Sequence, residues 1–277
     1  MEMTSLKLYG HPFAECFTLN QEFRMSSEMR NDACLAYVQS GKQEVYSPTQ
    51  KIIAKDRESI LMKCGNYIAN FTDVTPTSQF KSVVFHLDPE SIKKSFGDKD
   101  LSFLRVNKTN SPIDPALKIN RSALLESFVQ SMKPYFDNPA LSNEHLLSVK
   151  LQELVYILSD SGKNLVATQI IGTLYSPEEI AFDEIIEANL YNNLSIAELA
   201  HLTHRSESTF KRDFRKWYNE SPAKYLKTKR LEKAADLLNT TSLQINKIAW
   251  DCGFENAAHF SDSFHTHFGK SPKEYKT

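Results

Sequence analysis

The sequence predicts a multidomain α+β protein with a β-barrel and following helices in its N-terminal part and an all-α C-terminal part. Three observations support this fold class. Short runs of β-branched and aromatic residues occupy residues 5–90, and helical periodicity begins near residue 121. The third is an internal repeat, because Leu194–Tyr225 and Leu243–Tyr275 follow one pattern. The length of 277 residues suits two domains. We therefore expect a β-barrel domain over 1–118, a helical region over 119–176 and a helical domain over 177–277.

The charge is unevenly distributed along the chain. The formal net charge is −1, which by itself indicates no polyanionic partner. From Arg205 to Lys233, however, there are ten Lys or Arg and four Asp or Glu, whereas Glu178 to Glu187 holds five acids and no base. A basic segment within a neutral chain indicates a local binding surface.

Several classes of protein are disfavoured by simple sequence features. The four cysteines are far apart and form no CxxC pair or Cys/His cluster, so we expect neither disulfides nor zinc. The N-terminus lacks the pattern of a signal peptide, and no apolar run approaches the roughly 20 residues of a membrane span. We therefore expect a cytoplasmic protein without a membrane partner. No GxSxG, P-loop, GxGxxG or HExxH motif occurs, so neither a catalytic site nor a cofactor is expected.

The first 90 residues indicate a small barrel or sandwich. The strands expected from composition are Ala33–Val38, Gln43–Tyr46, Lys51–Ala54, Ser59–Lys63, Tyr67–Phe71 and Phe80–Leu87. A barrel can enclose a ligand. A metal site needs several converging histidines or carboxylates, yet His86 is the only histidine between Cys34 and Leu87. We expect His86 to be a hydrogen-bonded core or rim residue, with no metal.

Helices are expected after an irregular stretch at residues 88–118. Arg121–Phe136 carries one apolar face, formed by Leu124, Leu125, Phe128, Val129 and Met132. Ser142 is the expected N-cap of a helix ending near Ser159, and a third helix is expected at Leu165–Tyr175. Residues 121–175 can cover the barrel or form a homodimer surface, and the spacing allows both.

The first copy of the repeat has the pattern of a helix-turn-helix. A helix is expected at 178–190, with Ile180, Ala181, Ile185 and Ala188 facing inward. Ser195 and Glu198 form a capping box for a helix to Leu202, and a turn follows. Ser206 then caps a helix over Glu207–Tyr218. On that helix Phe210, Phe214 and Trp217 are expected in the core, and the opposite face carries Ser208, Lys211, Arg212 and Arg215.

The second copy repeats the skeleton with a different surface. Pro222 begins a connector helix that runs to Asn239 and is made basic by Lys224, Lys227, Lys229, Arg230 and Lys233. A short helix, a turn containing Gly253 and a helix over Asn256–Phe268 follow. Phe260, Phe264 and Phe268 repeat the core stripe, so Ala257, Ala258, His259 and Asp262 are expected outside. Corresponding positions are 49 residues apart in the first helix of each copy, as in Leu199 and Ile248, and 50 apart after the turn, as in Phe210 and Phe260.

These segments resemble the DNA-binding domain of AraC/XylS-type transcription regulators. The resemblance rests on SIAELA, FKRDFRKWYNESPAKYLKTKRLEKAADLL, INKIAWDCGF and HFSDSFHTHFGKSPKEY. It implies a cupin-like β-barrel ahead of a double helix-turn-helix, and two recognition helices in successive major grooves. It also implies a transcription activator in the bacterial cytoplasm, at the nucleoid, with double-stranded DNA and RNA polymerase as partners.

The residues expected to contact DNA follow from position on the matching segments. They are Ser206, Ser208, Thr209, Lys211, Arg212, Arg215, Lys229, Asn256, Ala257, Ala258, His259 and Ser261. One departure stands out, because the family usually carries Arg or Lys where this chain has Asp262, and often at His265. An acid facing the groove repels phosphate. We therefore expect the first copy to supply most of the affinity for DNA.

Two other functions compete with a directly acting regulator. One is a sensor whose barrel binds an unknown small-molecule effector that controls DNA binding. The other is an enzyme with a DNA-targeting domain, which needs a reactive cysteine in a polar, basic setting. Cys16, Cys34 and Cys64 lie mostly among apolar residues, which disfavours the enzyme.

Overall fold

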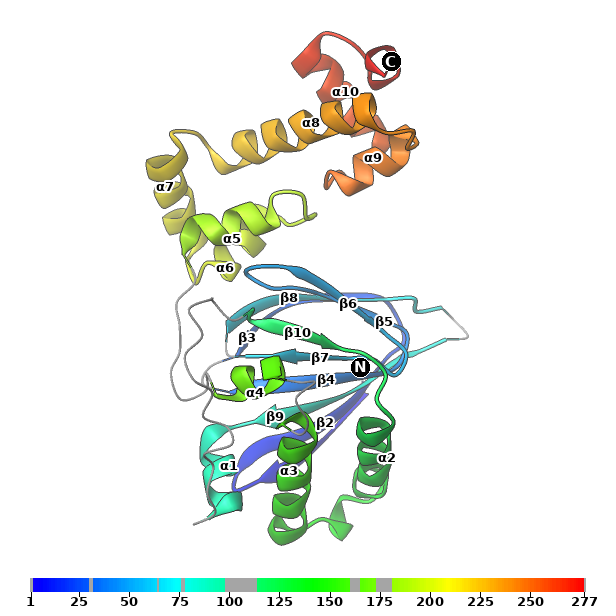
Figure 1. Ribbon diagram of the computed structural model, residues 1–277, viewed down its shortest axis with the longest axis vertical. Helices are drawn as coiled ribbons and strands as arrows, with labels where there is room; N and C mark the ends of the chain where they lie inside the picture. Colours follow the sequence, from blue (N-terminus) through cyan, green and yellow to red (C-terminus); the bar gives the residue numbers. More distant parts are fainter. Residues whose placement is uncertain are drawn as a thin grey trace. The chain divides into compact units, whose positions relative to one another are not determined.

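A computed structural model describes residues 2–29, 32–63, 65–75, 78–97, 114–159, 165–172 and 181–276. The chain divides into two compact units, Met1–Glu179 and Ile180–Thr277 (Figure 1). The strands of the first unit are β1 Glu2–Leu8, β2 His11–Leu19, β3 Phe23–Met29, β4 Ala33–Ser40, β5 Lys42–Tyr46, β6 Lys51–Lys55, β7 Ser59–Met62, β8 Gly65–Thr72, β9 Phe80–Leu87 and β10 Ala116–Ile119.

The described strands form two antiparallel sheets. One has the order β1-β2-β9-β4-β7-β10 and the other the order β3-β8-β5-β6. Alternate residues of the strands point between the sheets, where Ile60, Tyr67, Phe71 and Phe80 are buried in one apolar cluster. The expected α+β class with a β-rich first unit is confirmed.

Helices cover the other face of the larger sheet (Figure 1). They are α1 Pro89–Phe96, α2 Ala123–Asp137, α3 Glu144–Ser159 and α4 Leu165–Gly172, with a 3₁₀ turn η2 at Pro139–Leu141. Phe85 of β9 meets Phe128 of α2 with ring centroids 5.1 Å apart. Residues 123–159 thus act as a cover on the sheet. Residues 173–175 of the expected third helix lie outside the described residues.

The stretch 88–118 is more regular than expected. The Asp88 side chain accepts a hydrogen bond from the Ser91 N–H at 2.7 Å, and Pro89 follows it, so α1 begins there. β10 pairs with β7 across long sequence separation, which a local pattern does not encode. Residues 98–113 lie outside the described part of the chain.

Two details of the helical cover also differ from expectation. The N-cap of α3 is Asn143 instead of Ser142, because the Asn143 side chain accepts the Leu146 N–H at 2.9 Å. Ser142 instead donates its hydroxyl to the Pro139 carbonyl at 2.7 Å. Leu124 is 58% exposed, so it lies outside the apolar face of α2 on which it was expected.

The described secondary-structure elements of the second unit are all helices. Its helices are α5 Phe182–Asn189, α6 Ile196–Leu202, α7 Glu207–Tyr218, α8 Pro222–Thr240, α9 Ile245–Asp251, α10 Ala257–Phe268 and α11 Pro272–Tyr275. The expected start of the first helix, at residues 178–180, lies outside the described residues. Its core-facing residues are Phe182, Ile185, Ile186 and Asn189, whereas Ala181 is exposed. Among the described residues, no helix combines the length and apolar character that crossing a membrane requires.

Candidate nucleic-acid interface

Each copy of the repeat builds a separate aromatic core beneath its second helix. In the first copy the rings of Phe210 and Phe214 lie 5.6 Å apart, and Phe182 of the preceding helix α5 lies 5.6 Å from Phe210. In the second copy Phe260 and Phe264 are 5.5 Å apart. Because phenylalanines four residues apart lie on one helix face, each core fixes the opposite face of α7 or α10 toward solvent.

Trp217 lies at the exposed edge of the first core, with its ring 6.4 Å from that of Phe182. It is 60% exposed, and Tyr218 packs on Phe214, with centroids 4.5 Å apart. The next helix supplies Tyr225, whose ring lies 4.6 Å from that of Tyr218. Phe214, Tyr218 and Tyr225 therefore pack together, with Tyr225 contributed by α8.

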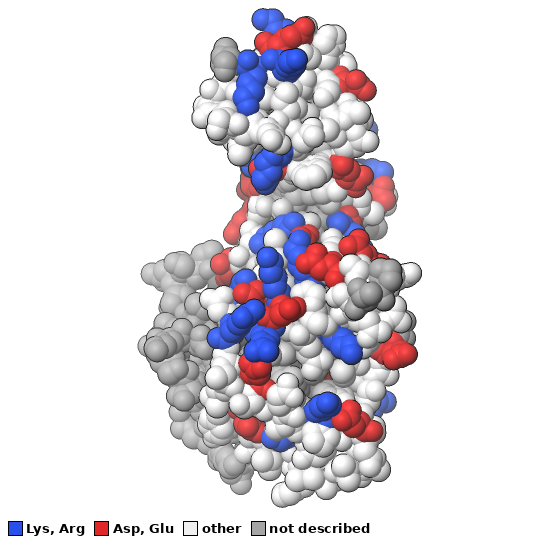
Figure 2. Space-filling model, turned by 90° about the vertical axis from the view of Figure 1, so that its right-hand side faces the viewer, with Lys and Arg blue, Asp and Glu red and all other residues white. Residues whose placement is uncertain are grey.

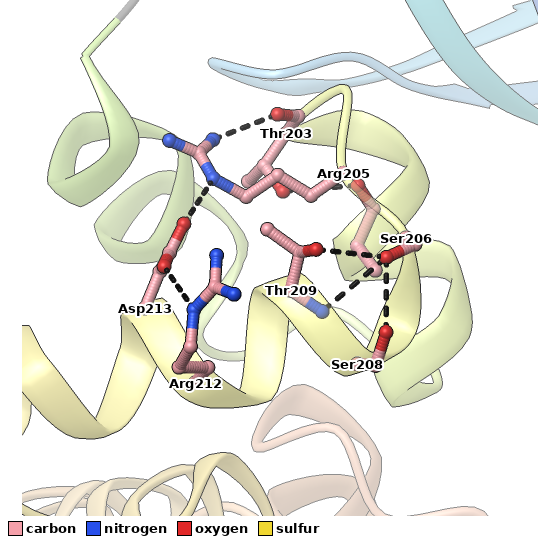
Figure 3. A network of polar contacts seen from close by, with 8 residues as sticks. Thr203, Arg205, Ser206, Ser208, Thr209, Arg212 and Asp213 are labelled. Atoms are coloured by element: carbon pink, nitrogen blue, oxygen red, sulfur yellow. Dashed lines mark hydrogen bonds and ion pairs between the residues drawn. The ribbon is translucent and has the colours of Figure 1, made fainter.

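Hydroxyl groups organise the start of α7. Ser206 accepts the backbone N–H of Thr209 at 3.3 Å, which caps the helix. The Ser206 Oγ also lies 3.1 Å from the Ser208 Oγ and 2.9 Å from the Thr209 Oγ1 (Figure 3). Ser206 and Ser208 are exposed and Thr209 is half-buried. The three DNA-contact candidates at the start of α7, which are Ser206, Ser208 and Thr209, therefore form one cluster of hydroxyl groups.

The basic residues predicted on α7 are exposed. Lys211 forms an ion pair with Glu207 one turn earlier. The Arg212 side chain is 75% exposed. Arg215 is exposed as well. The face opposite Phe210 and Phe214 therefore presents guanidinium and ammonium groups that can bind phosphates and guanine edges.

Arg205 and Asp213 were not predicted as functional residues. The Arg205 guanidinium donates from Nε to Asp213 Oδ2 at 3.0 Å and from Nη1 to the Thr203 carbonyl at 2.8 Å. It also lies 4.6 Å from the centre of the Phe182 ring. Asp213 turns its second oxygen, Oδ1, toward the Nε of Arg212 at 3.4 Å (Figure 3). The hydrogen bond from Arg205 is the main cause that lowers the pKa of Asp213, so the carboxylate stays charged.

The only sequence signal for this cluster was an arginine directly before the N-cap. Its partner is eight residues later, a spacing that helix periodicity does not pair. The turn brings Arg205 back over α7, so the contact depends on tertiary structure.

The second copy presents a less basic helix. Asn256 caps α10 by accepting the N–H groups of Ala258 at 2.7 Å and His259 at 3.4 Å. Ala258 and His259 are exposed and Ala257 is half-buried. The Ser261 hydroxyl donates to the Ala257 carbonyl at 2.8 Å, so it is already satisfied within the helix.

The helices α7 and α10 differ in charge. α7 carries Lys211, Arg212, Arg215 and Lys216 against Glu207 and Asp213, a net charge of +2. α10 carries Asp262 and no Lys or Arg, which gives −1 with neutral histidines. On the face seen in Figure 2, Lys and Arg are interspersed with Asp and Glu.

The connector helix α8 links the two copies through Arg230. Its guanidinium donates to the carbonyls of Leu190, Asn192 and Gly253 at 2.9, 2.7 and 3.1 Å. The first two carbonyls follow α5 and the third belongs to the turn between α9 and α10. The sequence indicates Arg230 only as part of a basic surface, whereas in the structure its guanidinium joins three backbone carbonyls and has a structural role. Burial lowers the pKa of Arg230.

Lys229, the candidate on the same helix, pairs with Glu232. Their Nζ and Oε2 atoms are 3.0 Å apart, and the Lys229 ammonium also lies 5.8 Å from the centre of the Tyr225 ring. Its charge is thus partly compensated within α8.

The side chains give less support to an enzyme with a reactive cysteine, or to a metal site, than to nucleic-acid binding. Burial raises the pKa of Cys16, Cys34 and Cys252, whereas a reactive cysteine needs a lowered pKa. Cys64 lies outside the described residues. No group of three metal-binding side chains suited to an ion occurs in the described part of the chain. His86 is hydrogen-bonded to Asp32 at 3.2 Å and Glu15 at 3.4 Å, which confirms it as a satisfied histidine.

Both parts of the chain match models of known protein families. Residues 33–168 match the ExsA N-terminal regulatory domain, and residues 199–277 match a helix-turn-helix domain. The chain is 36% identical to the HTH-type transcriptional regulator GbdR of Pseudomonas aeruginosa, over 32% of this chain and 24% of GbdR. It is 23% identical to the virulence regulon transcriptional activator VirF of Yersinia enterocolitica, over 61% of this chain and 62% of VirF.

The match thus spans about a quarter of GbdR and less than two thirds of VirF. Among solved structures, the chain is similar to the DNA-binding domain of AdpA in complex with a target DNA. That similarity has 28% identity and a TM-score of 0.33, and covers 34% of this chain and 88% of the other.

Proposed function

We infer that this chain, a member of the AraC/XylS-type family of transcription regulators, is a sequence-specific DNA-binding regulator of transcription. The observation that carries the proposal is the exposed basic face of α7, fixed by its aromatic core and repeated in skeleton by α10. Two such helices on one connector suit successive major-groove segments of one DNA face, about one helical turn apart. Residues 177–277 form the DNA-binding domain in this proposal, and 1–118 with 119–176 form its regulatory part.

The two helices divide the work unequally. The residues on α7 supply most of the affinity, because the +2 charge of this helix attracts the phosphate backbone. In the second copy the candidate contacts include Ala257, Ala258 and His259, none of which carries a permanent charge. An alanine can distinguish thymine from other bases by contact with its methyl group. The candidate contacts are the twelve residues predicted from sequence, with Lys229 and Ser261 weakened by their internal partners.

Selection of duplex DNA from a random pool tests the proposal. The full chain is expected to enrich one sequence with two contacted segments about 10 base pairs apart. Binding to that duplex, measured by fluorescence anisotropy, is expected to weaken steeply with salt, because each phosphate contact releases counterions. A chain that enriches no sequence contradicts the proposal.

We propose further that the protein is an activator that acts with RNA polymerase. VirF, which is named an activator, supports this direction of control. Transcription in vitro with bacterial RNA polymerase, from a promoter carrying the selected sequence, is expected to increase when the protein is added. A decrease would assign a repressor instead.

A homodimer formed through residues 121–175 is also proposed. Leu146, Val149 and Tyr156 of α3 are exposed, and they are three and seven residues apart, which puts them on one stripe. Leu124 and Leu141 are exposed on the same helical cover. Apolar groups gathered in this way are typical of protein interfaces. Control by a small-molecule effector in the barrel stays a prediction.

A further inference from the structure

Asp213 lies between two arginines with different surroundings. Arg205 is held by three separate groups, namely the Thr203 carbonyl, the Phe182 ring and Asp213 itself. Arg212 has one contact in this cluster, from its Nε to Asp213 Oδ1 at 3.4 Å, and its side chain is 75% exposed (Figure 3). The carboxylate therefore connects an anchored arginine to one that faces solvent.

This geometry bears on how Arg212 meets a base. A guanine offers O6 and N7 in the major groove, and an arginine reads both with two N–H groups. Because Asp213 occupies the Nε of Arg212, both terminal amino groups, Nη1 and Nη2, remain for the base. An arginine whose orientations are restricted by such a contact also loses less side-chain entropy on binding than a free one.

The ion pair with Arg205 solves the electrostatic problem of an acid near DNA. An isolated carboxylate beside the groove would repel phosphate. Here Arg205 neutralises Asp213 at 3.0 Å, so the acid can orient Arg212 with little net repulsion. The Thr203 carbonyl and the Phe182 ring in turn fix Arg205 to the turn and to α5.

We propose that Asp213 is a positioning residue that aims Arg212 at a guanine, with Arg205 as its anchor. The proposal rests on the proposed function and adds a specificity-determining residue to it. The second copy has no equivalent, because Asp262 replaces Arg212, a buried Ser263 replaces Asp213 and Glu255 replaces Arg205. Strong discrimination of guanine is therefore a property of the first copy alone.

Selection from a random duplex pool, repeated with variants of the full chain, tests the inference. Arg212→Ala is expected to abolish the preference for guanine at one position, which identifies the contacted base. Asp213→Asn is expected to reduce that preference about fivefold or more, by analogy with the loss of a fixed bidentate contact. Adding Asp213→Asn to Arg212→Ala is expected to change nothing further at that position.

Glu207→Gln is the matched control, because it also removes one negative charge from α7. Its effect on affinity is expected to be the same for the selected duplex and for a duplex lacking the guanine. Asp213→Asn is instead expected to weaken the first complex while the second stays unchanged or tightens, since one repulsive charge is gone. A merely structural defect would weaken both complexes equally.

Three outcomes overturn the inference: unchanged guanine preference in Asp213→Asn, equal losses on both duplexes, or an Arg212→Ala variant that keeps every guanine preference. A wild-type chain that enriches no sequence contradicts the proposed function itself, which is a distinguishable result. If Asp213→Asn shows no cooperative unfolding transition in urea, Asp213→Glu replaces it. That variant keeps the charge but shifts the carboxylate by one methylene, and the same loss of preference is expected.

Discussion

At the scale of single residues, Arg212 and His259 test how the two recognition helices share DNA affinity. Both are exposed, but only Arg212 carries a permanent charge and a bidentate donor pair. We expect Arg212→Ala to cost about 1–3 kcal/mol of binding free energy, the range for a good bidentate base contact. We expect His259→Ala to cost less. Anisotropy titrations of the selected duplex at one fixed salt concentration measure both, and equal losses would refute the asymmetry.

His86 predicts a pH dependence of stability. Burial alone lowers the pKa of His86, but the hydrogen bond to Asp32 and the charges of Glu15 and Asp32 outweigh it and raise the pKa above 6.5. Because the folded pKa is above the unfolded value, this stabilisation is complete below about pH 6.5 and is lost as pH rises through the raised pKa. Fully buried Cys34 pairs with His86 across β4 and β9 and adds no charge of its own in this range, because its pKa is raised.

The measurement is the urea midpoint of the full chain at about pH 6 and about pH 8. The urea midpoint of the wild type is expected to fall between about pH 6 and about pH 8. His86→Gln is expected to reduce this fall, because the variant has no cationic form to be stabilised. His145→Gln, on the exposed surface of α3, serves as control and is expected to keep the fall. Identical pH profiles for the wild type and His86→Gln would show that the cluster contributes nothing.

At the scale of elements, the turn between α9 and α10 is fixed by close backbone packing. Gly253 has φ +80°, and a Cβ at this position would lie 2.7 Å from the Tyr191 carbonyl oxygen and 3.1 Å from the Arg230 Nε. The turn, the end of α5 and the connector α8 therefore meet at one point. Arg230 ties the same three segments by hydrogen bonds. The spacing between the recognition helices thus depends on this junction.

Gly253→Ala is expected to destabilise the second unit more than Gly269→Ala does. Gly269 caps α10 with φ +73° and has nothing within 4 Å of its would-be Cβ, so it reports the backbone conformation alone. That conformation costs a non-glycine residue about 1–2 kcal/mol. Crowding at Gly253 adds roughly 1–3 kcal/mol. The variants are compared by their free energies of unfolding from urea titration. Equal losses for the two variants would show that the packing around Gly253 adjusts to the extra methyl group without loss of stability.

At the scale of the whole molecule, the exposed stripe on α3 predicts self-association. Val149→Glu places a charge in the middle of the stripe and is expected to shift a dimer to monomer, since burying an unpaired charge at an interface is costly. Sedimentation velocity measures the species. Leu243→Glu, another exposed apolar residue but in the second unit, is the control and is expected to leave the dimer intact. A wild-type chain that is monomeric at all accessible concentrations would exclude this surface as a homodimer interface.

Much of the second unit could be predicted from sequence because its signals are local. Ser206 caps α7, Asn256 caps α10, and phenylalanines four residues apart mark both buried faces. The first unit was less predictable. β10 lies far in sequence from its partner β7, and the polar composition of residues 88–118 predicts irregular chain where the structure has the helix α1, which Asp88 and Pro89 begin. At the site, the exposed candidates on α7 were predictable, whereas the pairings of Lys229 and Ser261 were not.

The sequence by itself determined the repeat, the N-cap of α7 and the polar faces of α7 and α10 that point outward, since helix periodicity and capping act within a few residues. Only the tertiary structure decided which polar groups meet. Arg205 reaches Asp213, Arg230 reaches three carbonyls, and Tyr218 packs on Phe214. Each of these choices depends on where one element arrives against another, and that position is set by packing of the whole unit rather than by spacing along the chain.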